Sequence, residues 1–244
     1  MRTIPVILPR RSFRCKNVAR EGCRRFQVEV TDATGIMIGV AANVFWIDWG
    51  DGNMDSDLMH TYEKAGAYEV VISGIDINQL NLSHCWLRSI DLSACPWLEY
   101  INVSFNFLKE LDVSCCPYLT VLLCERNLLR KLKLGDNLPW LVYLDCSCNL
   151  LGQLEFPSDC GLQYLLADSN QLVCLHFRNC PYLYCADIAD NIMQPPALQE
   201  ALDSLPTVPA ELSALVMYEL NPAFWQVDEM QLLKKGWHYD GDGR

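Results

Sequence analysis

The chain has 244 residues, of which 51% are hydrophobic, and a formal net charge of −11. This length allows one elongated domain or two compact ones, and the hydrophobic content is sufficient to bury a core. The longest apolar run, 35–47, is shorter than the roughly 18 residues of a membrane span, and the apolar stretch 4–8 is too short for a secretory signal.

Residues 1–25 form the first predicted segment, a basic arm. It carries eight Lys and Arg residues against one acid, Glu21, so its charge is +7 and the other 219 residues sum to −18. An acidic body of this size repels nucleic acid and anionic membranes, so we expect neither as a partner. The arm is predicted to fold against the acidic body or to be disordered, with contact to an anionic surface as the alternative.

Residues 26–76 are predicted to form a small β unit. Alternating apolar and polar residues indicate strands at 26–30, 44–49 and 68–72, and glycines at 50, 52 and 66 indicate turns. Within this unit, 51–57 has the alternating acids of a calcium loop, although it lacks the central glycine and has Tyr62 in place of the bidentate Glu. We interpret 51–57 as a polar turn, with a calcium site as the alternative.

Residues 77–193 contain an internal repeat. From Leu80, units of ten and eleven residues alternate, and each pair makes a repeat of 21 or 22 residues with apolar residues at the first, third and eighth positions of each unit. The first and third positions of a short strand point to the same side, so they are predicted to face a shared core while the positions beside them face outward. One unit cannot bury its apolar side alone, so the units are predicted to stack.

A polar or thiol column occupies the sixth position of each unit. An amide in this column can bond to backbone groups where the chain turns, and a cysteine can fill the same place as a small, weakly polar residue. The column consists of Cys85, Cys95, Asn106, Cys116, Asn127, Asn137, Asn149, Asp159, Asn170, Cys180 and Asn191. Leu138-Pro139 lengthens one unit and Asp159 displaces a thiol to Cys160, so these units are expected to be irregular.

Residues 194–244 are predicted to form an α/β cap. Leu198, Leu202 and Leu205 have helical spacing before Pro206, 215–218 is predicted to be a strand, and 227–235 a second helix that ends at Gly236.

The repeats resemble the leucine-rich-repeat family, in particular its short bacterial kind with nested halves of ten and eleven residues. The motif Trp49-Gly-Asp-Gly52 with His60-Thr-Tyr62 resembles a PKD-type sandwich, and the C-terminal segment resembles the terminal cap of the same bacterial proteins. The resemblance implies an α/β repeat fold: a leucine-rich-repeat solenoid with parallel strands, an N-terminal PKD-like β-sandwich cap and a C-terminal α/β cap. It also implies macromolecular recognition and a secreted or cell-surface location, whereas the sequence itself leaves the location open.

No pattern of catalytic or metal-binding residues emerges. The thirteen cysteines contain no CxxC pair, so they are predicted to be packed thiols, with Cys124 and Cys146 in the core, although an oxidised pair such as Cys95 with Cys116 is geometrically possible. The four histidines are scattered and have no nucleophile with an orienting partner nearby. We therefore predict a protein that is not an enzyme and needs no cofactor or metal.

The outward positions of the strands remain as the candidate binding surface. The predicted partner-binding residues are Tyr100, Asn102, Leu123, Glu125, Tyr143, Asp145, Tyr164, Leu166 and Asp168. Tyrosines dominate many interfaces and the acids favour a basic or hydroxyl-rich partner, so we predict a protein or a glycoconjugate as the ligand. The alternatives are that these tyrosines only shield the sheet, or that the chain is a calcium-dependent or glycan-active accessory domain of a surface enzyme. A second aromatic column, Trp97, Tyr118, Trp140 and Tyr182, is interpreted as sealing the edge of the stack.

Overall fold

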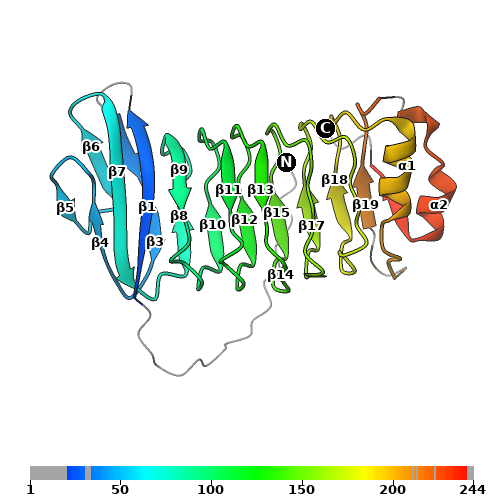
Figure 1. Cartoon of the computed structure of the whole chain (residues 1–244). Coiled ribbons are helices and arrows are strands. Elements are labelled where there is room, and N and C mark those ends of the chain that lie inside the picture. The colour runs from blue at the N-terminus through cyan, green and yellow to red at the C-terminus, as the bar shows by residue number, and fades with distance from the viewer. Residues whose placement is uncertain (1–20, 31–33, 210–211, 213, 223, 241–244) are drawn as a thin grey trace.

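The computed structural model describes residues 21–240 apart from 31–33, 210, 211, 213 and 223. The chain forms an elongated, sheet-rich stack with a β unit at one end and two short helices at the other (Figure 1). None of the helices in these residues is long and apolar enough to cross a membrane.

The N-terminal unit consists of a five-stranded antiparallel sheet, in the order β5-β4-β7-β1-β9, and the pair β2-β6. Its strands are β1 (Glu21–Val30), β2 (Thr34–Met37), β4 (Val44–Asp48), β5 (Met54–Asp55), β6 (Met59–Tyr62), β7 (Gly66–Ile75) and β9 (Leu87–Asp91). The three strands predicted from the sequence are confirmed as parts of β1, β4 and β7.

The boundary predicted between the basic arm and this unit is too late in the sequence. β1 begins at Glu21 and pairs with β7 along its whole length, because the cross-strand hydrogen bonds continue to Ile75. Residues 21–25 therefore belong to the sheet, and the rest of the predicted arm lies outside the described residues. The unit is also continuous with the repeats, since β9 pairs with β1 and β8 (Gln79–Asn81) pairs with β3 (Gly39–Ala41).

The repeats build a nine-stranded sheet in the order β20-β19-β18-β17-β15-β12-β10-β8-β3. All neighbouring pairs from β8 to β20 are parallel, and the first positions of the repeats, Leu122, Leu144 and Leu165, lie opposite one another. The strands between β8 and the C-terminal cap are β10 (Tyr100–Asn102), β12 (Val121–Leu123), β15 (Tyr143–Asp145), β17 (Tyr164–Leu166) and β18 (Cys185–Asp187).

The alternate half-repeats form the opposite side of the stack. Two short parallel pairs lie there: β11 (Glu110–Asp112) with β13 (Lys131–Lys133), and β14 (Asn137–Leu138) with β16 (Asp159–Cys160). The irregularity expected near Leu138-Pro139 is present, because Leu138 and Cys160 are buried whereas Asn137 and Asp159 are exposed. The predicted sixth-position column is therefore wrong at these two units, where Leu138 and Cys160 take the buried place.

A ladder of buried asparagines fixes the turn that follows each strand of the long sheet. The Nδ2 of Asn149 donates to the carbonyls of Cys124 and Cys146 at 3.0 and 3.1 Å, and its Oδ1 accepts from the backbone N–H of Leu129 at 2.9 Å. This satisfies backbone groups that would be costly to bury unpaired. The other members, Asn106, Asn127, Asn170 and Asn191, make the same kinds of bonds. Asn221, which the repeat alignment misses, extends the ladder into the C-terminal cap.

The thiols fill buried positions of the stack. Cys124 and Cys146 are both fully buried and lie in neighbouring repeats, so the predicted register is confirmed. Cys95, Cys116, Cys160 and Cys180 are buried on the opposite side, where Cys116 Sγ donates to the carbonyl of Cys95 at 3.4 Å.

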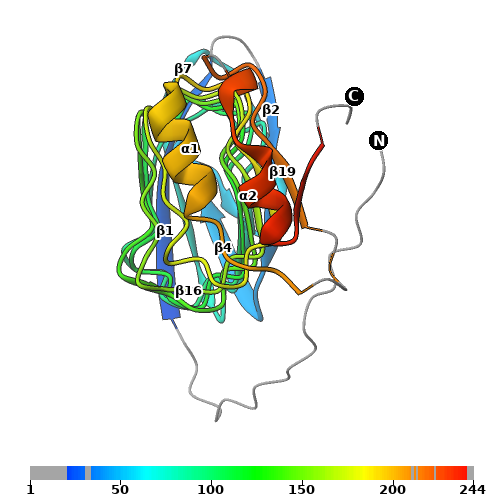
Figure 2. The same cartoon turned by 90° about the vertical axis from the view of Figure 1, so that its right-hand side faces the viewer.

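The C-terminal cap closes the far end of the stack. It contains α1 (Pro195–Asp203), β19 (Ala214–Met217), the 3-10 turn η1 (Phe224–Gln226), α2 (Glu229–Lys234) and β20 (Trp237–Tyr239). Figure 2 shows α1 and α2 side by side across this end. The two predicted helices and the predicted strand at 215–218 are thus present, with Leu198 and Leu202 buried in α1.

Candidate binding surface

The strands of the long sheet present their outward side chains in two columns. The first column contains the first strand position, with Tyr100, Val121, Tyr143, Tyr164 and Cys185 in register. The second contains the third strand position, with Asn102, Leu123, Asp145, Leu166 and Asp187 in register. Adjacent members of a column are about 4.8 Å apart, so each side chain contacts its neighbours in the next strand. We call this outward side of the long sheet the sheet face.

The sheet face is less open than the sequence suggests. All nine predicted binding residues lie on it or directly after its strands, but eight are half-buried and Asp145 is buried, with 7% exposure. The predicted residues are therefore on the outward side of the sheet, but they are largely covered. These side chains are half-buried because the columns are closely spaced. Rings such as Tyr143 and Tyr164, with centroids 5.9 Å apart, cover each other and the groups between them.

Tyr143 shows the consequence for chemistry. Burial, together with the negative charge of Asp145, raises the pKa of Tyr143 to about 12. The phenol therefore remains neutral over the physiological range and can act as a hydrogen-bond donor.

Carboxylates crowd the sheet face toward the ends of the strands. Asp145 and Asp187 end β15 and β18, and Glu125, Asp168 and Glu219 lie two residues after the ends of β12, β17 and β19. We call these five residues the acid row. The sequence interpretation left out Asp187 and Glu219. The signal for Asp187 was available, because it occupies the same column as Asp145, whereas Glu219 lies in the cap, beyond the repeat pattern.

The pKa values of the acid row reflect this crowding. Burial raises the pKa of Asp145 to about 6, with a smaller contribution from neighbouring Glu125 and against the hydrogen bonds that Ser147 donates. Burial, followed by the charges of Asp168 and Glu219, raises the pKa of Asp187 to about 7. Burial also raises the pKa of Asp168. Placing several ionised carboxylates here is unfavourable in the free protein, and a cation would relieve their repulsion.

A column of strained turns runs along the edge of the acid row. The residue before each ladder asparagine has a positive φ, at 57° for Phe105, 51° for Arg126 and 53° for Cys148, although none of them is glycine. The neighbouring asparagine ladder holds this conformation, which is costly for residues with a Cβ. The Arg126 guanidinium lies over the ring of Phe105, 5.5 Å from its centroid.

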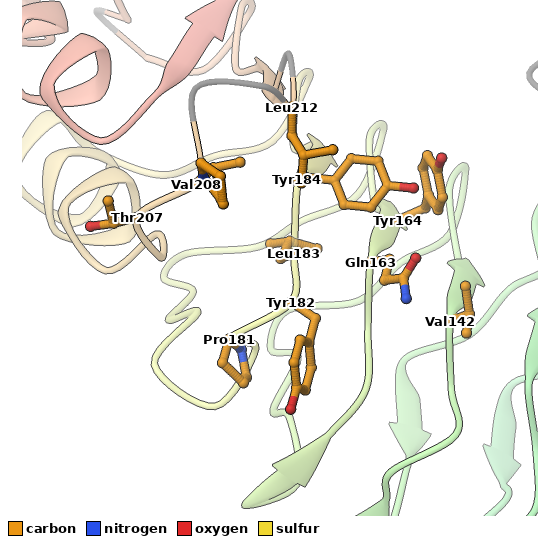
Figure 3. Close-up of a pocket in the computed structure, with 11 residues that line it drawn as sticks. Val142, Gln163, Tyr164, Pro181, Tyr182, Leu183, Tyr184, Thr207, Val208 and Leu212 are labelled. Carbon is orange, nitrogen blue, oxygen red and sulfur yellow. The ribbon is translucent and has the colours of Figure 1, made fainter.

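A groove opens at the other end of the strands, where the repeats meet the C-terminal cap (Figure 3). Its volume is about 700 Å³, and we call it the tyrosine pocket. It is lined by Val142, Gln163, Tyr164, Pro181, Tyr182, Leu183, Tyr184, Thr207, Val208, Pro209 and Leu212. The rings of Tyr164 and Tyr184 meet edge to face with centroids 4.6 Å apart, and Tyr182 is 63% exposed. The pocket therefore offers apolar walls with a few polar groups.

The second aromatic column only partly matches the sealing role expected of it. Trp97 and Tyr118 stack with centroids 5.3 Å apart, as rings of adjacent repeats. Tyr182, at the end of the same column, instead borders the tyrosine pocket. Sequence reasoning missed this pocket because the cap residues that close it, Thr207, Val208, Pro209 and Leu212, follow no repeat pattern.

The acids at 51–57 do not converge on a common point. Asp51 bonds to Asn53 and lies 2.7 Å from His60 Nε2, while Asp55 accepts from Trp49 Nε1 at 3.0 Å. His60 also stacks on Trp49, so these groups hold the turn of the β unit together. Within the described part of the chain, no group of three or more His, Cys, Asp or Glu residues is arranged to hold a metal ion.

No family model matches the chain, and no curated protein matches it. Among solved structures, it is similar to the functional domain of InlJ from Listeria monocytogenes, a structure described as including a cysteine ladder, at 17% identity and a TM-score of 0.34. The match covers 66% of this chain and 49% of that chain, so the chain spans about half the length of the protein it matches.

Proposed function

We propose that this chain is a non-enzymatic recognition module that binds a protein partner through the sheet face, with Lys or Arg side chains of the partner lying against the acid row. The observation that carries the proposal is the presence of acids on three neighbouring repeats. Asp145 and Asp187 lie in line with Leu166 in the second column, and Asp168 follows two residues after Leu166. The first column, with Tyr143 and Tyr164, lies beside them. Cationic groups neutralise mutually repelling carboxylates, and ordered rings supply contact area at small entropic cost.

We infer a leucine-rich-repeat solenoid with nested 21-residue repeats between a PKD-like N-terminal unit and an α/β C-terminal cap. The alternation of unit lengths, the asparagine ladder and the parallel pairing from β8 to β20 support the solenoid. The contacts around Trp49, whose motif resembles that of PKD-type domains, support the N-terminal assignment. A secreted or cell-surface location follows from the family resemblance.

The test compares three forms of the full chain as bait for proteins extracted from cell surfaces. One is unchanged, the second is the face variant Asp145→Asn/Asp168→Asn/Asp187→Asn, and the third is a control with the same loss of charge, Glu63→Gln/Glu110→Gln/Glu155→Gln, at exposed sites outside the acid row. A genuine partner is retained by the unchanged chain and the control but lost by the face variant. Its binding should also weaken as salt concentration increases, because exposed charges are screened.

The tyrosine column is tested with the partner so obtained. Tyr143→Ala should weaken its affinity by about 2 kcal/mol, roughly thirtyfold, as expected for an anchoring ring. Because Tyr143 is half-buried, the melting temperature of the variant is measured in parallel. A loss of stability with unchanged affinity would show that the tyrosines only shield the sheet. Binding of neutral oligosaccharides on a glycan array, equal in the unchanged chain and the face variant, would contradict the proposed role of the acids.

A further inference from the structure

We propose that the chain's own N-terminal arm, residues 1–20, occupies the sheet face in the absence of a partner, with its Arg and Lys residues on the acid row and its apolar segment 4–9 in the tyrosine pocket. The arm would then be an intramolecular ligand that a partner must displace. The inference uses the same acid row as the proposed function but does not depend on the existence of an external partner.

The charges of the two surfaces are complementary. Residues 1–20 contain Arg2, Arg10, Arg11, Arg14, Lys16 and Arg20 and no acid. In the acid row, the pKa values of Asp145, Asp168 and Asp187 are raised by burial and by neighbouring carboxylates. Bringing cations to this row relieves repulsion that already exists in the folded protein, and tethering raises their effective concentration.

The apolar part of the arm fits the tyrosine pocket. Residues 4–9 read Ile-Pro-Val-Ile-Leu-Pro, a sequence whose two prolines favour an extended backbone. Proline-containing extended segments bind in grooves lined by aromatic rings. The pocket presents Tyr164, Tyr182 and Tyr184 together with apolar side chains of the cap, and about 700 Å³ accommodates several side chains of this size (Figure 3).

The path along the sheet from Glu21 to the pocket crosses strands that carry members of the acid row. The arm joins the described structure at Glu21, which pairs with Ile75, four residues before β8 begins at Gln79. From β8, the sheet passes β12 and β15, which carry Glu125 and Asp145, before β17 and β18 (Figure 1). The pocket lies beside β17 and β18, at the opposite end of these strands from Asp168 and Asp187. In the arm, read from Glu21 toward Met1, most of the basic residues come first and the apolar segment follows.

The arm is also long enough. Five strand spacings separate β8 from β18, which is about 24 Å at about 4.8 Å each. Four extended residues between Ile75 and Gln79 add up to about 13 Å. The thirteen peptide units between Leu8 and Glu21 span about 43 Å when extended. The apolar segment therefore reaches the pocket without any change in the repeats.

The test is limited trypsin digestion of the full chain, because trypsin cleaves after the arm's own Arg10, Arg11, Arg14 and Lys16. The unchanged chain, the face variant and the charge-matched control defined above are digested at low salt, and cleavage at each arm site is followed by mass spectrometry. Cleavage requires the arm to leave the surface, so its rate depends on the fraction of released arm. The face variant should be cut about tenfold faster than the unchanged chain, since three carboxylates of the acid row are removed, whereas the control should match the unchanged chain.

Two further measurements complete the test. Tyr182→Ala, which removes an exposed ring from the pocket, should increase cleavage at Arg10 and Arg11 more than at Lys16, because the apolar segment adjoins the first two. In the unchanged chain, 0.5 M salt should release the arm to the same extent as the face substitutions; a free peptide of residues 1–20 corrects for the effect of salt on trypsin. Equal arm cleavage in the unchanged chain and the face variant, at low and high salt, would overturn the inference. It would leave the proposed function intact, since capture of an external partner is measured separately.

Discussion

Asp187→Asn tests whether the carboxylates of the acid row lower the stability of the folded protein. In the folded protein the pKa of Asp187 is raised to about 7 from 3.8, mainly by burial and then by Asp168 and Glu219. The folded state therefore binds this proton more tightly than the unfolded state. The stability that protonation contributes is fully present below about pH 3.8 and is lost as the pH rises through about 7.

The expected magnitude follows from that interval. About 3 pH units correspond to about 4 kcal/mol when the group is fully ionised. Asp187 keeps some contact with solvent, which reduces the net effect to about 1–2 kcal/mol. Asn retains a side-chain oxygen for the backbone N–H of Ala189, which Asp187 Oδ1 accepts at 3.1 Å. The variant should thus be more stable than the unchanged chain by about 1–2 kcal/mol at pH 8, with the gain disappearing near pH 4.

The assay is urea denaturation at a series of pH values between 4 and 8.5. The control is Asp159→Asn, which removes the same charge from an exposed residue on the opposite side of the stack. A gain that is independent of pH, or no gain at pH 8, would refute the idea that the acid row is destabilising in the free protein. A similar gain in the control would attribute the effect to net charge alone.

Three other predictions concern the stack itself. Cys146→Asp should destabilise the protein by about 3–5 kcal/mol at neutral pH, because Cys146 is fully buried; an unchanged urea midpoint would contradict the assigned register. Gly161→Ala should destabilise the protein by about 1–3 kcal/mol, because the added Cβ would lie 2.2 Å from the Pro139 carbonyl oxygen. Gly152→Ala should destabilise it less, because the nearest atom to its added Cβ is 4.0 Å away. Equal melting temperatures of the two variants would argue against this packing. Dithiothreitol should leave the melting temperature almost unchanged, because the eleven cysteines from Cys85 to Cys185 are free thiols, and a large drop would reveal a disulfide framework.

The sequence by itself determined the periodic part of the protein. A unit of ten or eleven residues fixes which positions share one side, so the sequence alone aligns Leu122, Leu144 and Leu165 and places Cys124 and Cys146 in the core. Local turn and strand patterns likewise located β4 and β7, because alternation of apolar residues is a property of neighbouring positions in the chain.

The tertiary structure decided how open the sheet face is and what borders it. Whether Asp145 is exposed depends on the side chains of the two adjacent strands, about 4.8 Å away in space, although they are about 20 residues away in the sequence. The tyrosine pocket needs Thr207, Val208, Pro209 and Leu212, and the acid row needs Glu219, from a cap that follows no repeat pattern. The burial of a side chain and the pKa shift that it causes depend on many neighbours that are remote in the sequence. The repeat pattern therefore located the outward columns, whereas the packing of adjacent strands and the cap determined the exposure and the pKa values of their side chains.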